Sequence, residues 1–179
     1  MLNIYVSMLR GINVGGNRGV KMEDLKRLYT SLGYRNVRTY VQSGNVVFEH
    51  HDANSSKLAG EIEKSLKQHF GFDISVVIRT DKELKRLIDK NPFTEKDESK
   101  MHVTFLSTKP RTFSTDQIDG FVASGEAFLI SGQDIYLFCP NGYGRTKLSN
   151  NFFEKTLKVI ATTRNWRTTK TLYSMTSGA

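Results

Sequence analysis

The sequence is poor in residues that cross-link a chain or interrupt its helices and strands, since its 179 residues include one cysteine and three prolines. It also contains one tryptophan. A single cysteine excludes an intrachain disulfide, so we expect a reducing, cytoplasmic setting. Cys139 stands in an apolar run and is predicted to be a small core residue. No apolar run reaches transmembrane length, and the run Leu2 to Leu9 meets Arg10 and glycines instead of a signal-peptide cleavage site, so no membrane partner is expected.

Groups that bind metals or carry protons are also scarce, since the chain has four histidines. His50 and His51 are adjacent and would point to opposite faces of a strand, while His69 and His102 are isolated. Cys139 has no evident base partner, and no pair of carboxylates stands out from the solvated acids. We therefore expect neither a metal nor another cofactor, and the sequence leaves the catalytic residues, if any, unassigned.

Positive charge is present in excess, at +8 in total with a pI of about 9.6. Residues 1–48 hold seven Lys/Arg against two acids, residues 49–140 hold twelve against fifteen, and residues 141–179 hold seven against one. The excess therefore belongs to the two ends of the sequence, which form one basic face if they meet in the fold. Taken singly, each of these side chains is better explained as a solvated residue on a helix.

The apolar spacing predicts the element order β-α-β-β-α-β in the first half of the chain. The predicted strands are 2–9, 36–41, 44–49 and 74–78, and the predicted helices are 22–32 and 58–70. Gly33 and Gly71 follow the two helices directly, where glycine commonly ends a helix. This order is typical of a ferredoxin-like unit, in which two helices pack on one face of an antiparallel sheet.

The same order begins again in the second half. Its predicted elements are a helix at 81–88 capped by Asp81, an exposed connector at 94–100, a strand at 101–107, a helix at 114–122, a hairpin of 127–130 and 135–139, a helix at 151–160 and a helical segment at 163–175. We therefore expect an α+β fold with two ferredoxin-like subdomains in tandem, 1–92 and 93–179. No convincing residue-level repeat is visible, so duplication is a hypothesis from the pattern.

A glycine-rich basic loop, residues 10–21, lies between the first strand and the first helix. Glycines let backbone amides approach an anion, and the start of a helix adds partial positive charge, so this loop is suited to phosphate or carboxylate. The named templates fail, since Asn17 and Arg18 stand where a Walker A loop needs Lys and Ser/Thr, and no G-x-G-x-x-G is present. A flexible connector explains the glycines equally well.

The first strand also resembles the short motif of RNA-recognition domains, where Tyr5 would be a stacking platform. The partner strand, 43–49, has Asn45 and Val47 where that domain needs aromatic rings. Because recognition by stacking needs more than one exposed ring, an ordinary core strand is the favoured interpretation.

Three further polar segments lie at predicted connections. Residues 38–45 surround a tight strand connection, although turn chemistry explains its Ser-Gly-Asn by itself. Residues 142–149 form a second basic glycine loop before a helix in which Asn151 and Glu154 are spaced like a capping box. In residues 162–167, Trp166 is predicted to be a core anchor, whereas Arg164 and Asn165 could contact an anion or cap a helix.

Three strings, Leu9 to Gly16, Val37 to Phe48 and Thr163 to Trp166, closely resemble the hallmarks of a bacterial family, domain of unknown function sixteen-ninety-seven. The resemblance spans nearly the whole chain, in the family's order. It implies a compact α+β protein with ferredoxin-like elements and no established reaction. The hallmark strings also include glycines of the loop 10–21 and of the 38–45 connection, together with Arg10, Arg38 and Arg164.

Our leading hypothesis is a module that binds a phosphorylated small molecule or nucleic acid, with the loop 10–21, the 38–45 connection and the region 144–165 converging on one anion-binding groove. One alternative is an enzyme acting on a small anionic substrate, which needs an acid or base that the sequence does not name. Another is an interaction protein or homo-oligomer, and the oligomeric state stays open. The candidate ligand-binding residues are Arg10, Asn13, Gly15, Gly16, Lys21, Arg38, Tyr40, Ser43, Asn45, Arg145, Lys147, Arg164 and Asn165.

Overall fold

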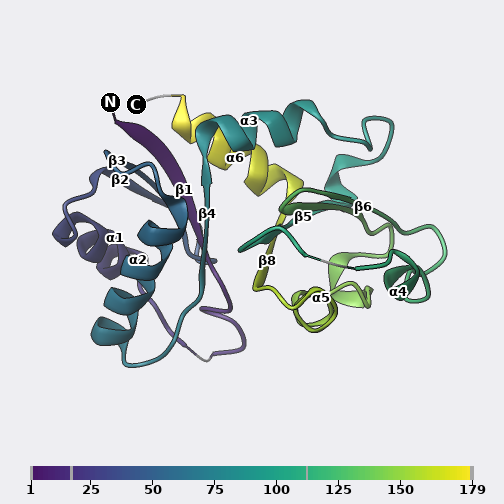
Figure 1. Ribbon diagram of the computed structural model, residues 1–179, viewed down its shortest axis with the longest axis horizontal. Helices are drawn as coiled ribbons and strands as arrows, with labels where there is room; N and C mark the ends of the chain where they lie inside the picture. Colours follow the sequence, from purple (N-terminus) through teal and green to yellow (C-terminus); the bar gives the residue numbers. More distant parts are fainter. Residues whose placement is uncertain (1, 17, 112, 178–179) are drawn as a thin grey trace. The chain divides into compact units, whose positions relative to one another are not determined.

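The computed structural model describes residues 2–16, 18–111 and 113–177 (Figure 1). The chain divides into two compact units. The first runs to Lys85 and includes the chain from Thr171 onward, and the second is Arg86–Lys170. Whether 1–92 and 93–179 are the parts that fold on their own stays a prediction. Within the described ranges, no helix is long and apolar enough to cross a membrane.

The first unit contains a four-stranded antiparallel sheet with the strand order β2-β3-β1-β4. Its elements are β1 (Asn3–Leu9), α1 (Met22–Ser31), β2 (Arg35–Tyr40), β3 (Asn45–His50), α2 (Ser55–Phe70), β4 (Val76–Thr80) and the start of α3 (Asp81–Asp89). In Figure 1, α1 and α2 lie on the same face of this sheet. The strands and helices predicted for this half are therefore present, with β4 displaced by two residues.

Both helices pack on the sheet because their apolar residues recur every three or four positions. Leu25 and Tyr29 of α1 and Leu58, Ile62 and Leu66 of α2 are fully buried in one cluster with alternate residues of the strands. Local signals set the ends of α2: the Asn54 side chain accepts a hydrogen bond from the amide of Lys57, and Gly71 ends the helix with a left-handed backbone, φ +81°.

The second unit has a second antiparallel sheet, with the strand order β6-β7-β5-β8. Its elements are β5 (Met101–Leu106), α4 (Asp116–Asp119), β6 (Ala127–Ser131), β7 (Asp134–Phe138), α5 (Asn150–Leu157), β8 (Ala161–Asn165) and the start of α6 (Trp166–Thr176), with 3-10 turns at Glu98–Lys100 and Tyr143–Arg145. Cys139 and Trp166 are 1% and 2% exposed, which confirms both as core residues.

Four predictions for element ends are corrected. The start of 163–175 is strand β8, because the β-branched residues Thr162 and Thr163 pair with β5, and the helix begins only at Trp166. Ser149, not Asn151, caps α5, and the carboxylate of Glu154 accepts the amide of Ala161 instead of closing a capping box. The helix expected at 114–122 is limited to Asp116–Asp119, with residue 112 outside the described residues.

The fourth correction concerns the start of α3, where Thr80 takes the capping role given to Asp81. The Thr80 hydroxyl accepts the amide of Glu83, and the Glu83 carboxylate accepts the amide of Thr80. This reciprocal pair satisfies two amides that the helix leaves open at its start.

The two units share their element order and their strand order. The correspondence extends to register, since Arg79 of β4 lies opposite Val6 and Arg164 of β8 lies opposite Val103. Both arginines are buried, at 2% and 7% exposed. The α+β class predicted from the sequence is confirmed as a mixed fold with two four-stranded antiparallel sheets.

Candidate functional site

The glycine-rich loop 10–21 is closed on itself by one side chain. The Asn13 Nδ2 atom donates to the carbonyl of Val20 at 2.9 Å, and its Oδ1 atom accepts the amide of Val20 at 2.8 Å. The backbone amide of Asn13 also donates to the carbonyl of Arg18. Asn13 adopts φ +54°, a left-handed conformation that asparagine tolerates better than most residues. These bonds close the base of the loop between Asn13 and Val20.

The same asparagine ties the loop to the β2–β3 connection, residues 41–44. Its Nδ2 atom also donates to the carbonyl of Gln42 at 2.7 Å, and the Leu9 amide donates to the carbonyl of Gly44 at 2.9 Å. Gly44 has φ +76°, and a Cβ atom there would lie 2.6 Å from Ile12 Cδ1 and 2.9 Å from Leu9 Cβ. Two of the hallmark strings thus meet in the first unit.

A third segment, the α2–β4 connection at residues 71–75, closes the group. The Arg10 amide donates to the carbonyl of Ser75 at 2.9 Å, and the Arg18 guanidinium lies over the Phe72 ring, 5.9 Å from its centre. A cation over an aromatic face is held electrostatically. We call the loop 10–21, the connection 41–44 and the connection 71–75 together the loop junction.

Charge and apolar side chains are both exposed at the loop junction. Arg18, Lys21, Gly15 and Gly16 are exposed, and Val14 is 67% exposed. Arg10 is half-buried, as is Arg38 on the neighbouring strand β2. The Arg38 Nε atom is buried and has no hydrogen-bond partner among the described residues. An unpaired buried donor of this kind is unfavourable, and an anion would satisfy it.

The polar residues predicted in the 38–45 connection serve the turn itself. Asn45 is fully buried, and its Nδ2 atom donates to the carbonyl of Tyr40 at 3.0 Å and to Ser43 Oγ at 2.9 Å. These contacts hold the strands β2 and β3 at the start of their hairpin.

The second basic loop, 142–149, lies in the second unit with Arg145 and Lys147 exposed. Its Tyr143 hydroxyl donates to Thr163 Oγ1 at 3.0 Å, and Thr163 Oγ1 donates to Asn150 Oδ1 at 2.6 Å. Because Thr163 has one hydroxyl proton, the 2.7 Å bond between Thr104 and Thr163 must be donated by Thr104. This chain of hydrogen bonds joins the loop, α5 and two strands.

Arg164 and Asn165 are both used inside the second unit. One terminal nitrogen of Arg164 donates to Thr162 Oγ1 at 2.8 Å and to the Thr163 carbonyl at 2.9 Å, and burial lowers the pKa of this guanidinium to about 10. Asn165 is exposed, and its Oδ1 accepts the amide of Thr168 at 2.7 Å as the cap of α6. The structure brings Arg10, Asn13, Gly44 and Ser75 together in one unit, whereas Arg145, Lys147, Arg164 and Asn165 belong to the other.

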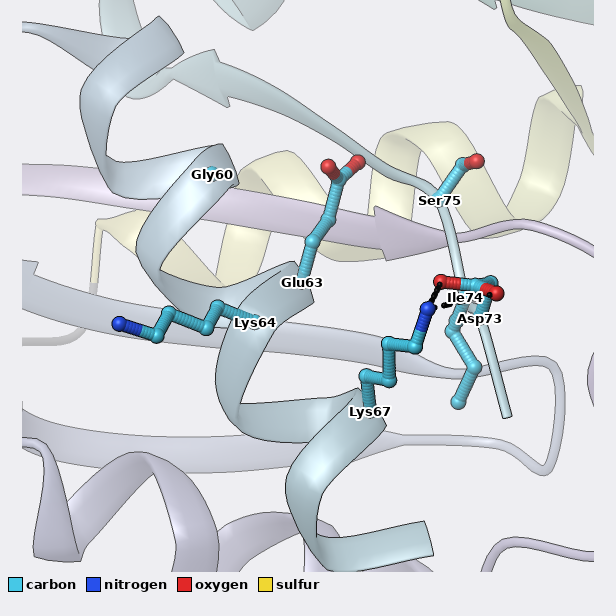
Figure 2. Close-up of a pocket in the computed structure, with 7 residues that line it drawn as sticks. All are labelled: Gly60, Glu63, Lys64, Lys67, Asp73, Ile74 and Ser75. Atoms are coloured by element: carbon cyan, nitrogen blue, oxygen red, sulfur yellow. Dashed lines mark hydrogen bonds and ion pairs between the residues drawn. The ribbon is translucent and has the colours of Figure 1, made fainter. Parts of the chain in front are cut away.

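Sequence reasoning missed an open pocket of about 340 Å³ beside the α2–β4 connection. Figure 2 shows Lys67 reaching Asp73, while Lys64 points away from that pair and the Glu63 carboxylate lies on the same side as Ser75. Glu63 also accepts the amide of Val76 at 2.8 Å. The pocket residues are Gly60, Glu63, Lys64, Lys67, Asp73, Ile74 and Ser75. Its one sequence signal is Gly60, a glycine inside an exposed helix face, where glycine is unfavourable.

Other chemistry finds no support in the described ranges. They contain no group of three or more His, Cys, Asp and Glu side chains that could hold a metal ion. Burial raises the pKa of the Cys139 thiol to about 11, which keeps it protonated at neutral pH. Burial lowers the pKa of His102, whose ring stacks on Tyr143.

The chain is similar to a protein family and to solved structures. A family model described as a protein of unknown function (DUF1697) matches residues 2–136. The solved structure of the conserved bacterial protein SP0830 from Streptococcus pneumoniae is similar with a TM-score of 0.72, covering 98% of this chain and 99% of that one at 24% identity. At that identity the likeness speaks for the fold alone. No curated protein matches the chain.

Proposed function

The chain belongs to the DUF1697 family of proteins of unknown function, as its motifs predicted, and we propose that it is a binding module holding an anionic ligand at the loop junction. One observation carries the proposal. Asn13 closes the base of the loop 10–21 with bonds to Val20 and Gln42, so the chain's own hydrogen bonds hold these three residues together. A preformed site loses less conformational entropy when it binds, which favours affinity.

The chemistry of the loop supports an anion. Gly15 and Gly16 are exposed and have φ of +60° and +76°, conformations that leave backbone amides open to a close ligand. Arg18 and Lys21 are exposed around them, and Arg38 offers an unpaired Nε. The ligand class is a phosphate or carboxylate group, carried by a small molecule or by a polymer.

The remaining candidate residues enter the proposal in two ways. Asn13, Ser43 and Asn45 shape the junction through the bonds described above, and Tyr40 receives one of them at its carbonyl. Arg145 and Lys147 are proposed as anion contacts supplied by the second unit, with Arg164 and Asn165 supporting its sheet and helix. That the two loops face one groove stays a prediction.

We also propose that each unit is ferredoxin-like and that the two arose by duplication. Both units share the order β-α-β-β-α-β followed by a helix, and equivalent strands occupy equivalent places in the two sheets. The matched register of Arg79 and Arg164 adds a residue-level correspondence.

The test of anion binding is a titration with inorganic pyrophosphate, followed by amide NMR signals. We expect saturable shifts within residues 10–21, with Arg18→Gln and Lys21→Gln each weakening affinity on the order of fivefold to tenfold. Lys26→Gln is the matched control, because Lys26 is an exposed lysine of α1. Shifts confined to other segments, or an equal effect of the control, would refute the site. A second titration uses a thymidine oligonucleotide of twelve nucleotides. If its affinity does not change with salt concentration, nucleic acid is excluded as the anionic ligand.

A further inference from the structure

Val41 is held in a backbone conformation that its side chain disfavours. It has φ +49°, in the left-handed region where a β-branched residue is a true outlier, since its Cβ substituents crowd the backbone. The side chain is 47% exposed, so burial does little to offset this cost. Glycine or asparagine would adopt the same turn with less strain. Strain of this kind persists mostly where it serves a function.

A second exposed valine belongs to the same loop junction. Val14, which is 67% exposed, follows Asn13, and Val41 precedes Gln42, so the 2.7 Å bond from Asn13 to the Gln42 carbonyl joins their immediate neighbours. Across the described residues the exposed large hydrophobic side chains are Val14, Val41, Phe121, Leu129 and Ile160. The two that belong to the first unit are therefore both at the loop junction.

The charge of the loop and of the hairpin connection has one sign. Residues 2–22 and 35–48, which contain them, include no Asp or Glu, while Arg18 and Lys21 are exposed. The acid of the third segment, Asp73, is paired with Lys67. An occupant that covers the valines must therefore bring negative charge as well as apolar surface. Nucleic acid brings the charge, but its bases are held by stacking on rings. Residues 10–21 and 41–44 contain no aromatic residue, and the Phe72 ring of the connection 71–75 lies under the Arg18 guanidinium.

We propose that the valine pair and the adjacent Arg18 and Lys21 dock an acidic segment of a partner protein that carries aliphatic side chains. This inference rests on the proposed anion binding at the loop junction and names its ligand class. Carboxylates of the partner pair with the arginine and the lysine. Its aliphatic side chains cover Val14 and Val41, which gain the burial that they lack in the free protein.

The experiment compares two fluorescent eight-residue peptides by anisotropy, one alternating Glu with Leu and one alternating Glu with Ser. We expect the Glu/Leu peptide to bind the full chain on the order of tenfold tighter, because only it can cover the valines. The double variant Val14→Ser, Val41→Asn should bring that ratio to about one without weakening the Glu/Ser peptide. Ile160→Asn is the matched control and should keep the ratio. Thermal unfolding of each variant checks that it folds.

Three results would overturn the inference: no binding of either peptide, equal affinity of the two peptides for the original chain, or a preference for Glu/Leu that survives the double variant. Tighter binding of the thymidine oligonucleotide than of the Glu/Leu peptide would also overturn it, in favour of nucleic acid. A different result would refute the proposed anion binding: pyrophosphate and the Glu/Ser peptide would bind Arg18→Gln and Lys21→Gln with the same affinity as the original chain.

Discussion

Asn13 pairs through its side-chain amide with both backbone groups of Val20, donating to the carbonyl at 2.9 Å and accepting the amide at 2.8 Å. The side-chain amide thus makes the two hydrogen bonds that a paired strand would make with Val20, and it closes the loop in this way. Since the same Nδ2 atom also reaches the carbonyl of Gln42, a single residue sets the geometry of the loop junction.

Replacing Asn13 should therefore loosen the junction. We expect Asn13→Gly to destabilise the protein by about 1–3 kcal/mol, because it leaves partly buried backbone groups unpaired while it tolerates the positive φ. Asn13→Ala should cost about 1 kcal/mol more, since alanine disfavours that conformation. Urea unfolding measures both. Gln42→Ala is the control and should stay within about 0.5 kcal/mol, because only the carbonyl of Gln42 takes part in the bond. Asn13→Gly behaving like this control would contradict the assigned role.

Gly44 should be sensitive to any side chain for two reasons. Its φ is positive, and a Cβ atom would lie within 3.0 Å of both Ile12 and Leu9. We expect Gly44→Ala to destabilise by more than about 2 kcal/mol. Gly33→Ala separates the two causes, because Gly33 has φ +83° with open space around it, and it should cost only about 1 kcal/mol. Equal losses of unfolding free energy would show that the close approach to Ile12 and Leu9 has no energetic weight.

Gly60 should behave in the opposite way. It lies inside α2, and a Cβ atom there would meet nothing within 4 Å, so no packing reason favours glycine. We expect Gly60→Ala to stabilise the protein by about 0.5–1 kcal/mol, as measured by urea unfolding. The substitution also adds a methyl group to the pocket wall. Glu61→Ala, on the same exposed turn, is the control for a change in surface composition. A loss of stability in Gly60→Ala would mean that α2 needs the glycine backbone.

Glu98 should make the stability of the protein depend on pH, and the fluorescence emission of Trp166 can report the titration of Glu98. The hydrogen bond from Lys170 lowers the pKa of Glu98, and Trp166 Nε1 also donates to this carboxylate, at 3.2 Å. A carboxylate with a lowered folded-state pKa adds stability above its unfolded pKa, and that stability is lost as the pH falls through the folded value. We expect a change in Trp166 emission below the usual glutamate range. Glu98→Gln should abolish it, and its persistence in that variant would assign it to another group.

Elements whose evidence is local were predictable from the sequence. The apolar stripe of α2 and the terminal Gly71 lie within one stretch of chain, so periodicity and the helix-ending rule identified them, although the helix begins at Ser55 and not at the predicted residue 58. Residues 163–165 of strand β8 were predicted as the start of a helix, because this strand forms only through pairing with β5, some 60 residues earlier. Local preference is weak for such residues, and tertiary pairing overrides it.

The candidate site shows the same division. Glycines and basic residues marked the loop 10–21, but the role of Asn13 depends on Val20 and Gln42, and the strain of Val41 is visible only in its φ. The pocket beside α2 has no motif, because its residues come from two segments that carry no shared pattern. Arg164 was predicted as a ligand contact from its residue type. The structure shows that it is buried and donates hydrogen bonds to Thr162 and Thr163.

The sequence by itself determined the family, the α+β class, most strands and helices, and the concentration of positive charge near the glycine loops. Each of these follows from residue type or from spacing within one segment. Tertiary structure decided which amide closes the loop, which arginines are buried and which valines stay exposed. Those outcomes depend on contacts between segments far apart in the chain, where hydrogen-bond geometry and burial, rather than local propensity, set the free energy.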